Sequence, residues 1–379
     1  MKAVATMMLA LLLADAAQAG GFVLATWNIQ TLTTPNERVF PNQRSDQLRK
    51  ESDMGDLRAV RDAVGADVVM LEEISSPKAL AQVFPAADWH ICLSGQFTAD
   101  TRGLGPDYPS DKLADIRPLC FSAAGADLPD PPPGELRKQY VAVAVRKASG
   151  VSIQSIADVP DISVPFDDKD DTGAVVVRNV RWGLEVVVAK GDKTLRILGV
   201  HLKTGCFTGP LFRDLWDGPP FQFQHDDHAD NPCKTLARQM RPLRTWIARA
   251  AQQGTPFVIV GDFNRQIDAD ANHAAEPDLF PVLTGTATET TTDDVMLARV
   301  PEGSVSIRGC WPEDDSSDQK NAIDYLIFGP GARPTDWEAT YKKLRFVDLP
   351  SIGGASLTKR DNDWRLSDHC PVRVSINWN

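Results

Sequence analysis

The sequence predicts a single domain of the mixed α/β or α+β class. Short apolar runs rich in β-branched residues alternate with segments whose apolar residues recur every three to four positions, a pattern typical of strands and helices. No polar linker divides the chain, and no internal repeat is present, which favours one domain. With 379 residues, the chain is long enough to bury one large core or two smaller ones.

Residues 1–19 have the pattern of a secretory signal peptide. Lys2 provides the positive end, residues 3–14 form an apolar run, and Ala17-Gln18-Ala19 is a small-residue cleavage site. The run is too short for a membrane span, although an uncleaved anchor is the alternative. We therefore expect cleavage after Ala19, a mature domain over residues 20–379 without stable membrane insertion, and a secreted or periplasmic protein.

The first half of the chain alternates strands with one long helix. Residues 21–29 (GFVLATWNI) predict a strand that ends in Trp27-Asn28, and residues 47–64 predict a helix that Gly65 terminates. A buried strand over residues 67–71 then leads into Glu72-Glu73. Further strands are predicted over residues 89–93, 140–146, 175–180 and 184–189.

The second half continues this alternation. Residues 195–201 (LRILGVH) predict a strand that ends on His201, and residues 236–251 carry apolar residues on one helical face. Residues 257–264 (FVIVGDFN) predict a strand buried on both faces, after which Asp262 and Asn264 point the same way and Phe263 points back into the core. The alternative for these eight residues is an ordinary Asp/Asn turn. Strands over residues 322–328 and 370–376 close the chain.

Two segments, residues 94–136 and 204–232, are rich in Gly, Pro and Asp and are predicted to be inserted loops. The even number of cysteines fits an oxidising compartment, and the absence of C-x-x-C spacing argues against zinc or redox use. Pairing in sequence order predicts three disulfides, of which the first two would each close one inserted segment. They are Cys92–Cys120, Cys206–Cys233 and Cys310–Cys370.

The chain is acidic, with 40 Lys and Arg against 51 Asp and Glu and a net charge of −11. It therefore lacks the basic surface of a tight nucleic-acid binder. An enzyme that must release a polyanion tolerates this charge, and a divalent cation can supply local positive charge. The composition thus argues against a binding module more than against a hydrolase. We expect a monomer.

Polar side chains stand at the ends of most of the predicted buried strands. A single buried histidine or aspartate is more often a core residue with a hidden partner than a catalyst. So many on different strands are hard to explain that way, because each desolvated carboxylate needs a counter-charge. Convergence on a divalent metal and a phosphate explains them together. They are Asn28, Glu73, His201, Asp262, Asn264, Asp324, Asp368 and His369.

Six short motifs occur in the order found in the endonuclease/exonuclease/phosphatase superfamily, which includes deoxyribonuclease I, apurinic endonucleases, inositol polyphosphate 5-phosphatases and neutral sphingomyelinases. The motifs are Trp27-Asn28-Ile29, Leu71-Glu72-Glu73, Gly199-Val200-His201-Leu202-Lys203, Gly261-Asp262-Phe263-Asn264, Ile323-Asp324-Tyr325 and Ser367-Asp368-His369. The resemblance runs from Gly21 to the C-terminus. It implies a four-layered α/β/β/α sandwich of two packed, mixed β-sheets flanked by helices, with the site at one end.

The resemblance also implies a metal site. Glu73 and Asp368, with Asn28 nearby, are expected to hold Mg²⁺ or Mn²⁺, because such hard cations prefer oxygen ligands. Glu72 departs from the family, in which a glutamine commonly precedes the metal glutamate. This difference adds a negative charge and leaves two adjacent carboxylates as candidate ligands; the motif position favours Glu73.

The remaining polar residues are expected to act on the phosphate and the attacking water. Asp262 and His369 would orient and deprotonate the water, and Asp324 would fix the tautomer of His369. Asn264 would donate hydrogen bonds to the non-bridging phosphate oxygens. His201 would do the same or protonate the leaving oxygen.

Three functions follow from these expectations. The first is a secreted, metal-dependent phosphodiesterase, most simply a nuclease that hydrolyses DNA or RNA by in-line attack. The second is a phosphatase or a sphingomyelinase-like phospholipase, and the third is a catalytically silent binding protein. Every polar strand end that catalysis needs is present, which disfavours the third. Lys203 and Arg265 are further candidates to contact phosphate.

Overall fold

A computed structural model describes twelve stretches of the chain and three single residues. The predicted signal peptide and most of the second inserted segment lie outside the described residues. The described residues are 20–38, 44–104, 113, 115–123, 125–129, 139–169, 173–207, 211, 232–267, 279–284, 295–302, 309–311, 313, 322–362 and 364–377.

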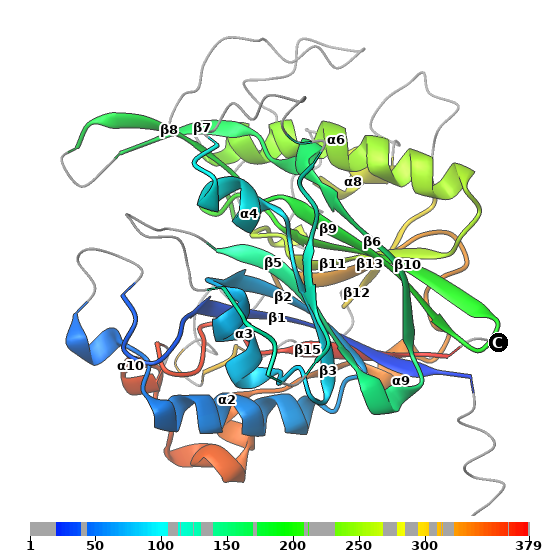
Figure 1. Ribbon diagram of the computed structural model, residues 1–379. Helices are drawn as coiled ribbons and strands as arrows, with labels where there is room; N and C mark the ends of the chain where they lie inside the picture. The colour runs from blue at the N-terminus through cyan, green and yellow to red at the C-terminus, as the bar shows by residue number, and fades with distance from the viewer. Residues whose placement is uncertain are drawn as a thin grey trace, which may run out of the picture.

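Two β-sheets form the centre of the molecule (Figure 1). Sheet A has the order β14 (Lys342–Lys343), β15 (Val372–Ile376), β1 (Phe22–Leu32), β2 (Val68–Ile74), β5 (Tyr140–Arg146), β3 (Trp89–Leu93), β4 (Leu119–Phe121). Sheet B has the order β12 (Ala298–Val300), β13 (Asp324–Phe328), β11 (Phe257–Asp262), β10 (Lys193–His201), β9 (Gly183–Lys190), β6 (Ser152–Val159). A separate ribbon pairs β7 (Pro165–Lys169) with β8 (Val175–Asn179). Both sheets are mixed, because β1–β2 and β10–β11 are parallel and the other pairs are antiparallel.

The sheets pack face to face, and helices cover their outer faces. Alternate residues of β2 divide between two cores: Val68 and Met70 face sheet B, whereas Val69 and Leu71 face the helices. Helices α2 (Glu51–Val64) and α3 (Pro77–Val83) lie on sheet A. Helices α6 (Pro232–Gln252) and α8 (Leu279–Thr284) lie on sheet B at the opposite side of Figure 1. The predicted four-layered sandwich is confirmed.

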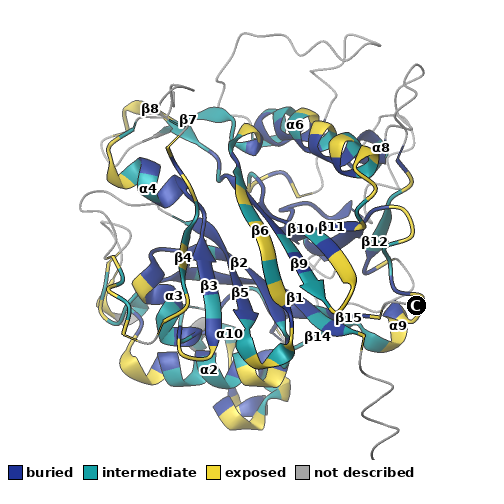
Figure 2. Cartoon of the chain, turned by 45° about the vertical axis from the view of Figure 1, so that its right-hand side comes forward, coloured by how far each residue is buried: buried dark blue, intermediate teal, exposed yellow. Residues whose placement is uncertain are grey.

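Burial follows this layering. In Figure 2 the strands of both sheets are mostly buried, whereas exposed residues gather on the outer faces of the helices and on the edge strand β6. None of the described helices combines the length and the apolar character needed to cross a membrane. The short helix α9 (Trp337–Thr340) contacts β15 near the margin of sheet A, and α10 (Lys359–Asn362) lies in the segment between β14 and β15.

Every strand predicted from an apolar run is present, as are the two predicted long helices. The described part of the first inserted segment contains regular secondary structure. It forms α4 (Gln96–Thr101) and β4, which extends sheet A as an edge strand. The prediction of a loop was wrong there because β4 is only three residues long and is held by pairing with β3, which no local pattern indicates.

The three predicted disulfides are confirmed. Cys92 lies directly opposite Cys120 on the paired strands β3 and β4. Cys206, shortly after β10, is linked to Cys233 in the first turn of α6. Cys310 is linked to Cys370, the residue that follows His369.

Candidate active site

Three polar strand ends lie in one row of sheet B. In the register of the sheet, His201 is the partner of Asp262, and Asp262 is the partner of Asp324. Strands β10 and β11 end at this row and the antiparallel strand β13 begins there, so the three side chains share one edge of the sheet. The row needs a glycine before Asp262: Gly261 has a φ of 139°, and a Cβ there would lie 2.0 Å from Val200 O.

Asp262 is held by the turn that follows it. The backbone N–H of Asn264 donates to Asp262 Oδ1 at 2.7 Å, and Asn264 Nδ2 donates to Asp262 Oδ2 and to Leu202 O, both at 3.1 Å. Phe263 points into the core, as the alternation predicts. The Asn264 amide, expected to bind phosphate, therefore orients Asp262 in this structure. Burial raises the pKa of Asp262 to about 7, although His369 and the Asn264 N–H oppose this shift.

His369 lies against two aspartates of the row. Its Nδ1 is 3.0 Å and 3.1 Å from the two carboxylate oxygens of Asp324, and its Nε2 is 3.7 Å from Asp262 Oδ2. Burial disfavours the imidazolium, but the carboxylates of Asp324, Asp262 and Asp368 outweigh burial and raise the pKa of His369 well above its usual value. The predicted contact between Asp324 and His369 is thus present. It keeps a proton on Nδ1.

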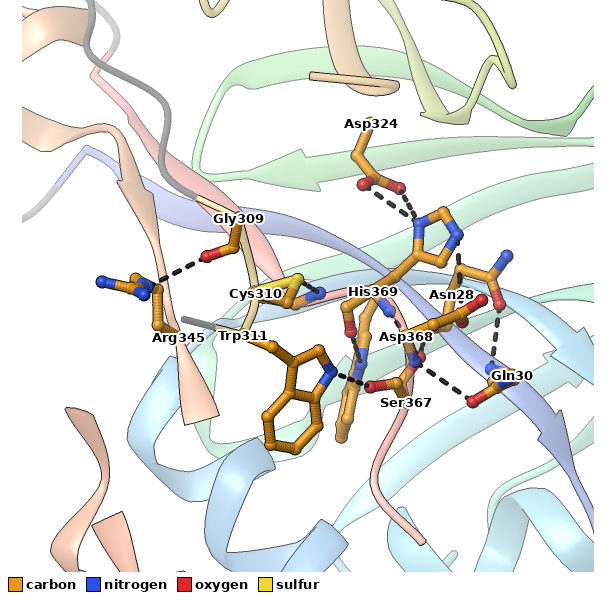
Figure 3. Close-up of a disulfide and its surroundings, with 12 residues drawn as sticks. Asn28, Gln30, Gly309, Cys310, Trp311, Asp324, Arg345, Ser367, Asp368 and His369 are labelled. Atoms are coloured by element: carbon orange, nitrogen blue, oxygen red, sulfur yellow. Dashed lines mark hydrogen bonds and ion pairs between the residues drawn. A yellow bond between two sulfur atoms is a disulfide. The ribbon is translucent and has the colours of Figure 1, made fainter. Parts of the chain in front are cut away.

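The turn that carries His369 is anchored on several sides (Figure 3). The Cys310–Cys370 disulfide follows it directly. Two tryptophans donate to its backbone: Trp27 Nε1 to His369 O and Trp311 Nε1 to Ser367 O, both at 3.2 Å. Ser367 Oγ donates to Asn28 O at 2.7 Å, which joins this turn to the end of β1. The imidazole is therefore held by covalent and hydrogen-bonded links independent of Asp324.

Glu73 enters the site from sheet A, at an irregular strand end. Its φ of 64° is unusual for a non-glycine residue, and the pairing of β2 with both neighbours shifts register close to it. Its Oε2 accepts from Thr31 N at 2.9 Å, from Thr31 Oγ1 at 3.1 Å and from Gln139 Nε2. Among the described residues, its Oε1 has one hydrogen bond, at 3.3 Å from Asn28 Nδ2, and it faces His201. Oε1 is the oxygen that can take a further partner.

Asn28 links the two sheets. Its Nδ2 donates to Glu73 Oε1 and, at 3.1 Å, to Asp262 Oδ2, while its Oδ1 accepts from Gln30 N at 2.9 Å. These contacts fix the amide with its N–H groups toward the carboxylates. Asn28 therefore orients two carboxylates in this structure. Its Oδ1 has a second lone pair, and the contact of Asn28 with a metal ion stays a prediction.

Glu72 and Glu73 have different surroundings. Glu72 is completely buried between the sheets, where its Oε1 accepts from Thr26 Oγ1 at 2.8 Å. Burial raises its pKa well above the usual value, and the charges of Asp324 and Asp262 add to this effect. A neutral carboxylic acid has nearly the shape of the glutamine that the family commonly has here. Glu73, not Glu72, faces the polar residues of the site.

Asp368 lies beside the bend after Asn28. Its backbone N–H donates to Gln30 Oε1 at 3.1 Å, its Oδ1 is 4.0 Å from His369 Nε2, and its side chain is 43 % exposed. Glu73 Oε1 and the Asp368 carboxylate thus offer hard oxygen donors at the same corner, and both are electrostatically coupled to Arg49. This donor set fits Mg²⁺ or Mn²⁺, which bind one or two carboxylates and keep open positions for water and phosphate.

A second group of candidate ligands is formed by Asp262, Asp324 and His369, whose donor atoms lie within 4.8 Å of one another. Here the imidazole Nδ1 already faces both oxygens of Asp324. An ion between them would have to replace that hydrogen bond. The group is better interpreted as an Asp–His–Asp proton-transfer cluster, and the oxygen donors on the sheet A side as the metal site.

His201 differs from His369 in lacking a carboxylate at Nδ1. Its Nε2 is 3.7 Å from Glu73 Oε1 and 3.6 Å from Asp262 Oδ2, whereas its buried Nδ1 has no hydrogen-bond partner among the residues that the structure describes. Burial lowers the pKa of His201 well below its usual value, and the charges of Arg181 and His369 add to this effect. The neutral ring with its proton on Nε2 fits these contacts.

The sequence analysis missed four residues of the site. Gln139, just before β5, receives a hydrogen bond from Arg181 and passes one to Glu73. Thr31 and Arg49 hold the bend after Asn28. Gln139 and Arg181 stand next to predicted strands, which is a weak signal. Thr31 and Arg49 have no such signal in the sequence, because Thr31 lies in a bend and Arg49 lies just before a helix.

The two predicted phosphate-binding cations have other contacts in this structure. Arg265 is fully buried and its guanidinium donates to Cys206 O at 3.1 Å, so it braces the loop after β10 and is not presented to a ligand. Lys203 is half-buried, with its Nζ 4.5 Å from the centroid of the Phe166 ring on β7.

Residues 25–369 match the model of the Endonuclease/Exonuclease/phosphatase family. The chain belongs to this family. Its members are phosphoester hydrolases that generally use a divalent metal. No curated protein sequence matches the chain significantly.

Several solved structures are similar over nearly the whole chain. D. rerio TDP2 complexed with a single-strand DNA product is 12 % identical, with 94 % of this chain and 99 % of that chain covered and a TM-score of 0.48. An endonuclease/exonuclease/phosphatase from Bacteroides vulgatus is 12 % identical, with 95 % and 99 % covered and a TM-score of 0.46. The human Nocturnin catalytic domain is 11 % identical, with 94 % and 93 % covered and a TM-score of 0.42. Membership of the family rests on the sequence match.

Proposed function

We propose that this protein is a Mg²⁺- or Mn²⁺-dependent phosphodiesterase that hydrolyses DNA or RNA and that residues 1–19 direct its export. The observation that supports this most is the row of His201, Asp262 and Asp324 in sheet B, which Asn28 joins to Glu73 in sheet A. A general base, a paired imidazole and an ion-binding carboxylate thereby surround one point. Phosphodiester hydrolysis needs these groups together.

The residues divide the reaction between them. Asp262, whose pKa burial raises to about 7, accepts the proton of the attacking water, because a base works best when its pKa is near the working pH. His369, held by Asp324 at Nδ1, stabilises the negative charge of Asp262 from 3.7 Å away. His201 donates its Nε2 proton to a non-bridging phosphate oxygen. Glu73 and Asp368 would hold the divalent ion, which would supply positive charge to offset the negative charge on the phosphoryl oxygens.

The superfamily that the motifs resemble includes nucleases, sphingomyelinases and inositol polyphosphate phosphatases, and on this breadth we propose a nucleic acid as the substrate. The β7–β8 ribbon bears on the same choice. Val175 and Val177 are 66 % and 41 % exposed on it, which would suit a lipid surface. Asp167, however, lies directly opposite Val177 and points to the same side, so the face carries a carboxylate that disfavours insertion into lipid.

A substrate panel tests the proposal. Plasmid DNA, RNA, sphingomyelin, inositol phosphates and bis-p-nitrophenyl phosphate are incubated with the protein in Mg²⁺, in Mn²⁺ and in EDTA. We expect cleavage of a nucleic acid and of bis-p-nitrophenyl phosphate with metal and none in EDTA. Turnover of sphingomyelin or inositol phosphates alone would establish the alternative substrate class, and full activity in EDTA would eliminate the metal.

A further inference from the structure

A strained bend follows Asn28 and contacts both predicted metal ligands. Gln30 and Thr31 have φ values of 35° and 55°, and Thr31 is β-branched, so its conformation is unfavourable without outside support. Thr31 donates through its N–H and its hydroxyl to Glu73, and Gln30 accepts from the N–H of Asp368. The shape of this bend therefore sets where Glu73 and Asp368 stand relative to each other.

Arg49 is the residue that supports the bend. Its Nη1 donates to Thr31 O at 2.8 Å, and its Nη2 donates to Ile29 O at 2.8 Å. Left-handed residues turn their peptide groups out of the regular ladder, so these buried carbonyls need donors from outside the sheet. The guanidinium supplies them on both sides of Gln30.

The same guanidinium also reaches the segment that leads into Asp368. Its Nη2 donates to Leu366 O at 3.2 Å and its Nε to Arg365 O at 3.4 Å. Arg49 is 3 % exposed and stands just before α2, more than 300 residues away from Leu366. The planar guanidinium of Arg49 thus binds both the bend that contacts Glu73 and the segment before Asp368. The rigid arrangement of its N–H groups fixes the spacing between these two segments.

We propose that Arg49 is a positioning residue that sets the separation of Glu73 and Asp368 and so determines the affinity of the site for Mg²⁺ or Mn²⁺. This inference rests on the metal site of the proposed function. Arg49 touches neither the ion nor the substrate and acts through the backbone on both sides of the site. Its charge is a separate contribution, because it also lies within electrostatic range of both carboxylates.

The substitution Arg49→Lys separates geometry from charge. A lysine keeps the positive charge but has one ammonium group, which cannot bind Thr31 O, Ile29 O and Leu366 O in a fixed plane. Groups that orient metal ligands typically change metal affinity 10- to 100-fold when they are lost. We expect Arg49→Lys to weaken Mn²⁺ binding by about this factor in isothermal titration of the whole chain, at a temperature where circular dichroism shows it folded.

Arg146→Lys is the matched control. The Arg146 Nε donates to Ala66 O at 3.1 Å, at the opposite end of sheet A. The control should lower the melting temperature without changing the Kd for Mn²⁺. A purely structural role for Arg49 would give the same pattern in Arg49→Lys, and that result would overturn the inference.

A second variant covers the case in which Arg49→Lys does not fold. Gln30→Ala removes only the hydrogen bond to the Asp368 N–H, and a several-fold weaker Kd is expected. An unchanged Kd would count against the bend as the link between the ligands. Native protein that binds Mn²⁺ but cleaves no phosphodiester would refute the proposed function and leave this inference standing, whereas native protein that binds no Mn²⁺ would refute both.

Discussion

The two sheets deliver their functional residues in different ways. In sheet B, His201, Asp262 and Asp324 stand in one unbroken row of a regular register. In sheet A, Glu73 and the bend after Asn28 have left-handed backbone and interrupted pairing. The sheet B end is set by strand pairing together with the turn after Asp262, in which Asn264 has a φ of 50°. The sheet A end exists only because donors from other elements hold it.

The difference follows the chemistry that each end is proposed to perform. Proton transfer needs a base and an imidazole at short distances. Strand pairing places Asp262 beside Asp324, and Asp324 holds the imidazole of His369, which lies on the turn before β15. A metal site needs two carboxylates turned toward one point, and a regular strand would send Glu72 and Glu73 to opposite faces. The left-handed conformation of Glu73 brings its carboxylate to the sheet B side while Glu72 stays between the sheets. We thus propose that the irregular end in sheet A binds the metal ion and that the regular end in sheet B carries out the proton transfer.

The largest expected effect comes from exchanging one carboxylate at each end for its amide. Asp262→Asn should lower kcat for bis-p-nitrophenyl phosphate by about 10³-fold or more, because it removes the general base. Glu73→Gln should instead weaken metal binding, so that much of its activity returns at high Mg²⁺. Steady-state rates across a Mg²⁺ titration distinguish the two.

The proposed difference between the two ends would be wrong if added Mg²⁺ restored the activity of both variants to the same extent. Titration calorimetry provides the control, since Asp262→Asn should keep a Kd for Mn²⁺ within a few-fold of the native value.

A smaller effect is expected from the disulfide beside His369. Replacing Cys310 and Cys370 by alanine should lower kcat by about 10-fold, because the turn that carries His369 loses its covalent anchor. The Cys92→Ala, Cys120→Ala pair is the control, since it lies at the edge of sheet A away from the row. Both pairs should lower the melting temperature, because each removes a cross-link worth about 4 kcal/mol. Equal kcat in the two double variants would show that hydrogen bonds alone hold the turn.

The smallest effect concerns a contact between the two sheets. Asp158 of β6 accepts from the N–H of Gly95, which follows β3, at 2.8 Å. Burial raises the pKa of Asp158 from 3.8 to about 7, although the Gly95 N–H and Arg117 oppose this shift. Since folding favours the protonated form, this group's contribution to stability is full below pH 4 and is lost as the pH rises to about 7.

The substitution Asp158→Asn should remove that dependence. Between pH 4 and pH 8 the native protein should lose about 2 kcal/mol more unfolding free energy than the variant. Urea denaturation at both pH values measures it. Parallel pH profiles for the two proteins would mean that Asp158 is ionised throughout and that the contact between the sheets does not titrate.

The sequence by itself determined the sheet B end and the covalent frame. Asp262 follows an apolar, β-branched run, and period-two alternation alone separates it from Phe263. The cysteines are paired in sequence order. Each disulfide links two segments that the helices and strands between them bring back together. These features depend on local chain geometry, which residue type and spacing encode.

Only the tertiary structure decided the sheet A end. The orientation of the Asn28 amide depends on Asp262, and the role of Arg49 depends on Leu366, both far away in sequence. The carboxylate of Glu73 is held by Thr31 and Gln139. Arg265 shows the opposite case. Its position in the motif puts it next to the site, but in the structure its guanidinium is buried against Cys206 O. A bend with left-handed backbone is unfavourable by itself and is stable only when buried hydrogen bonds from other elements compensate its strain. No local sequence pattern therefore predicts it.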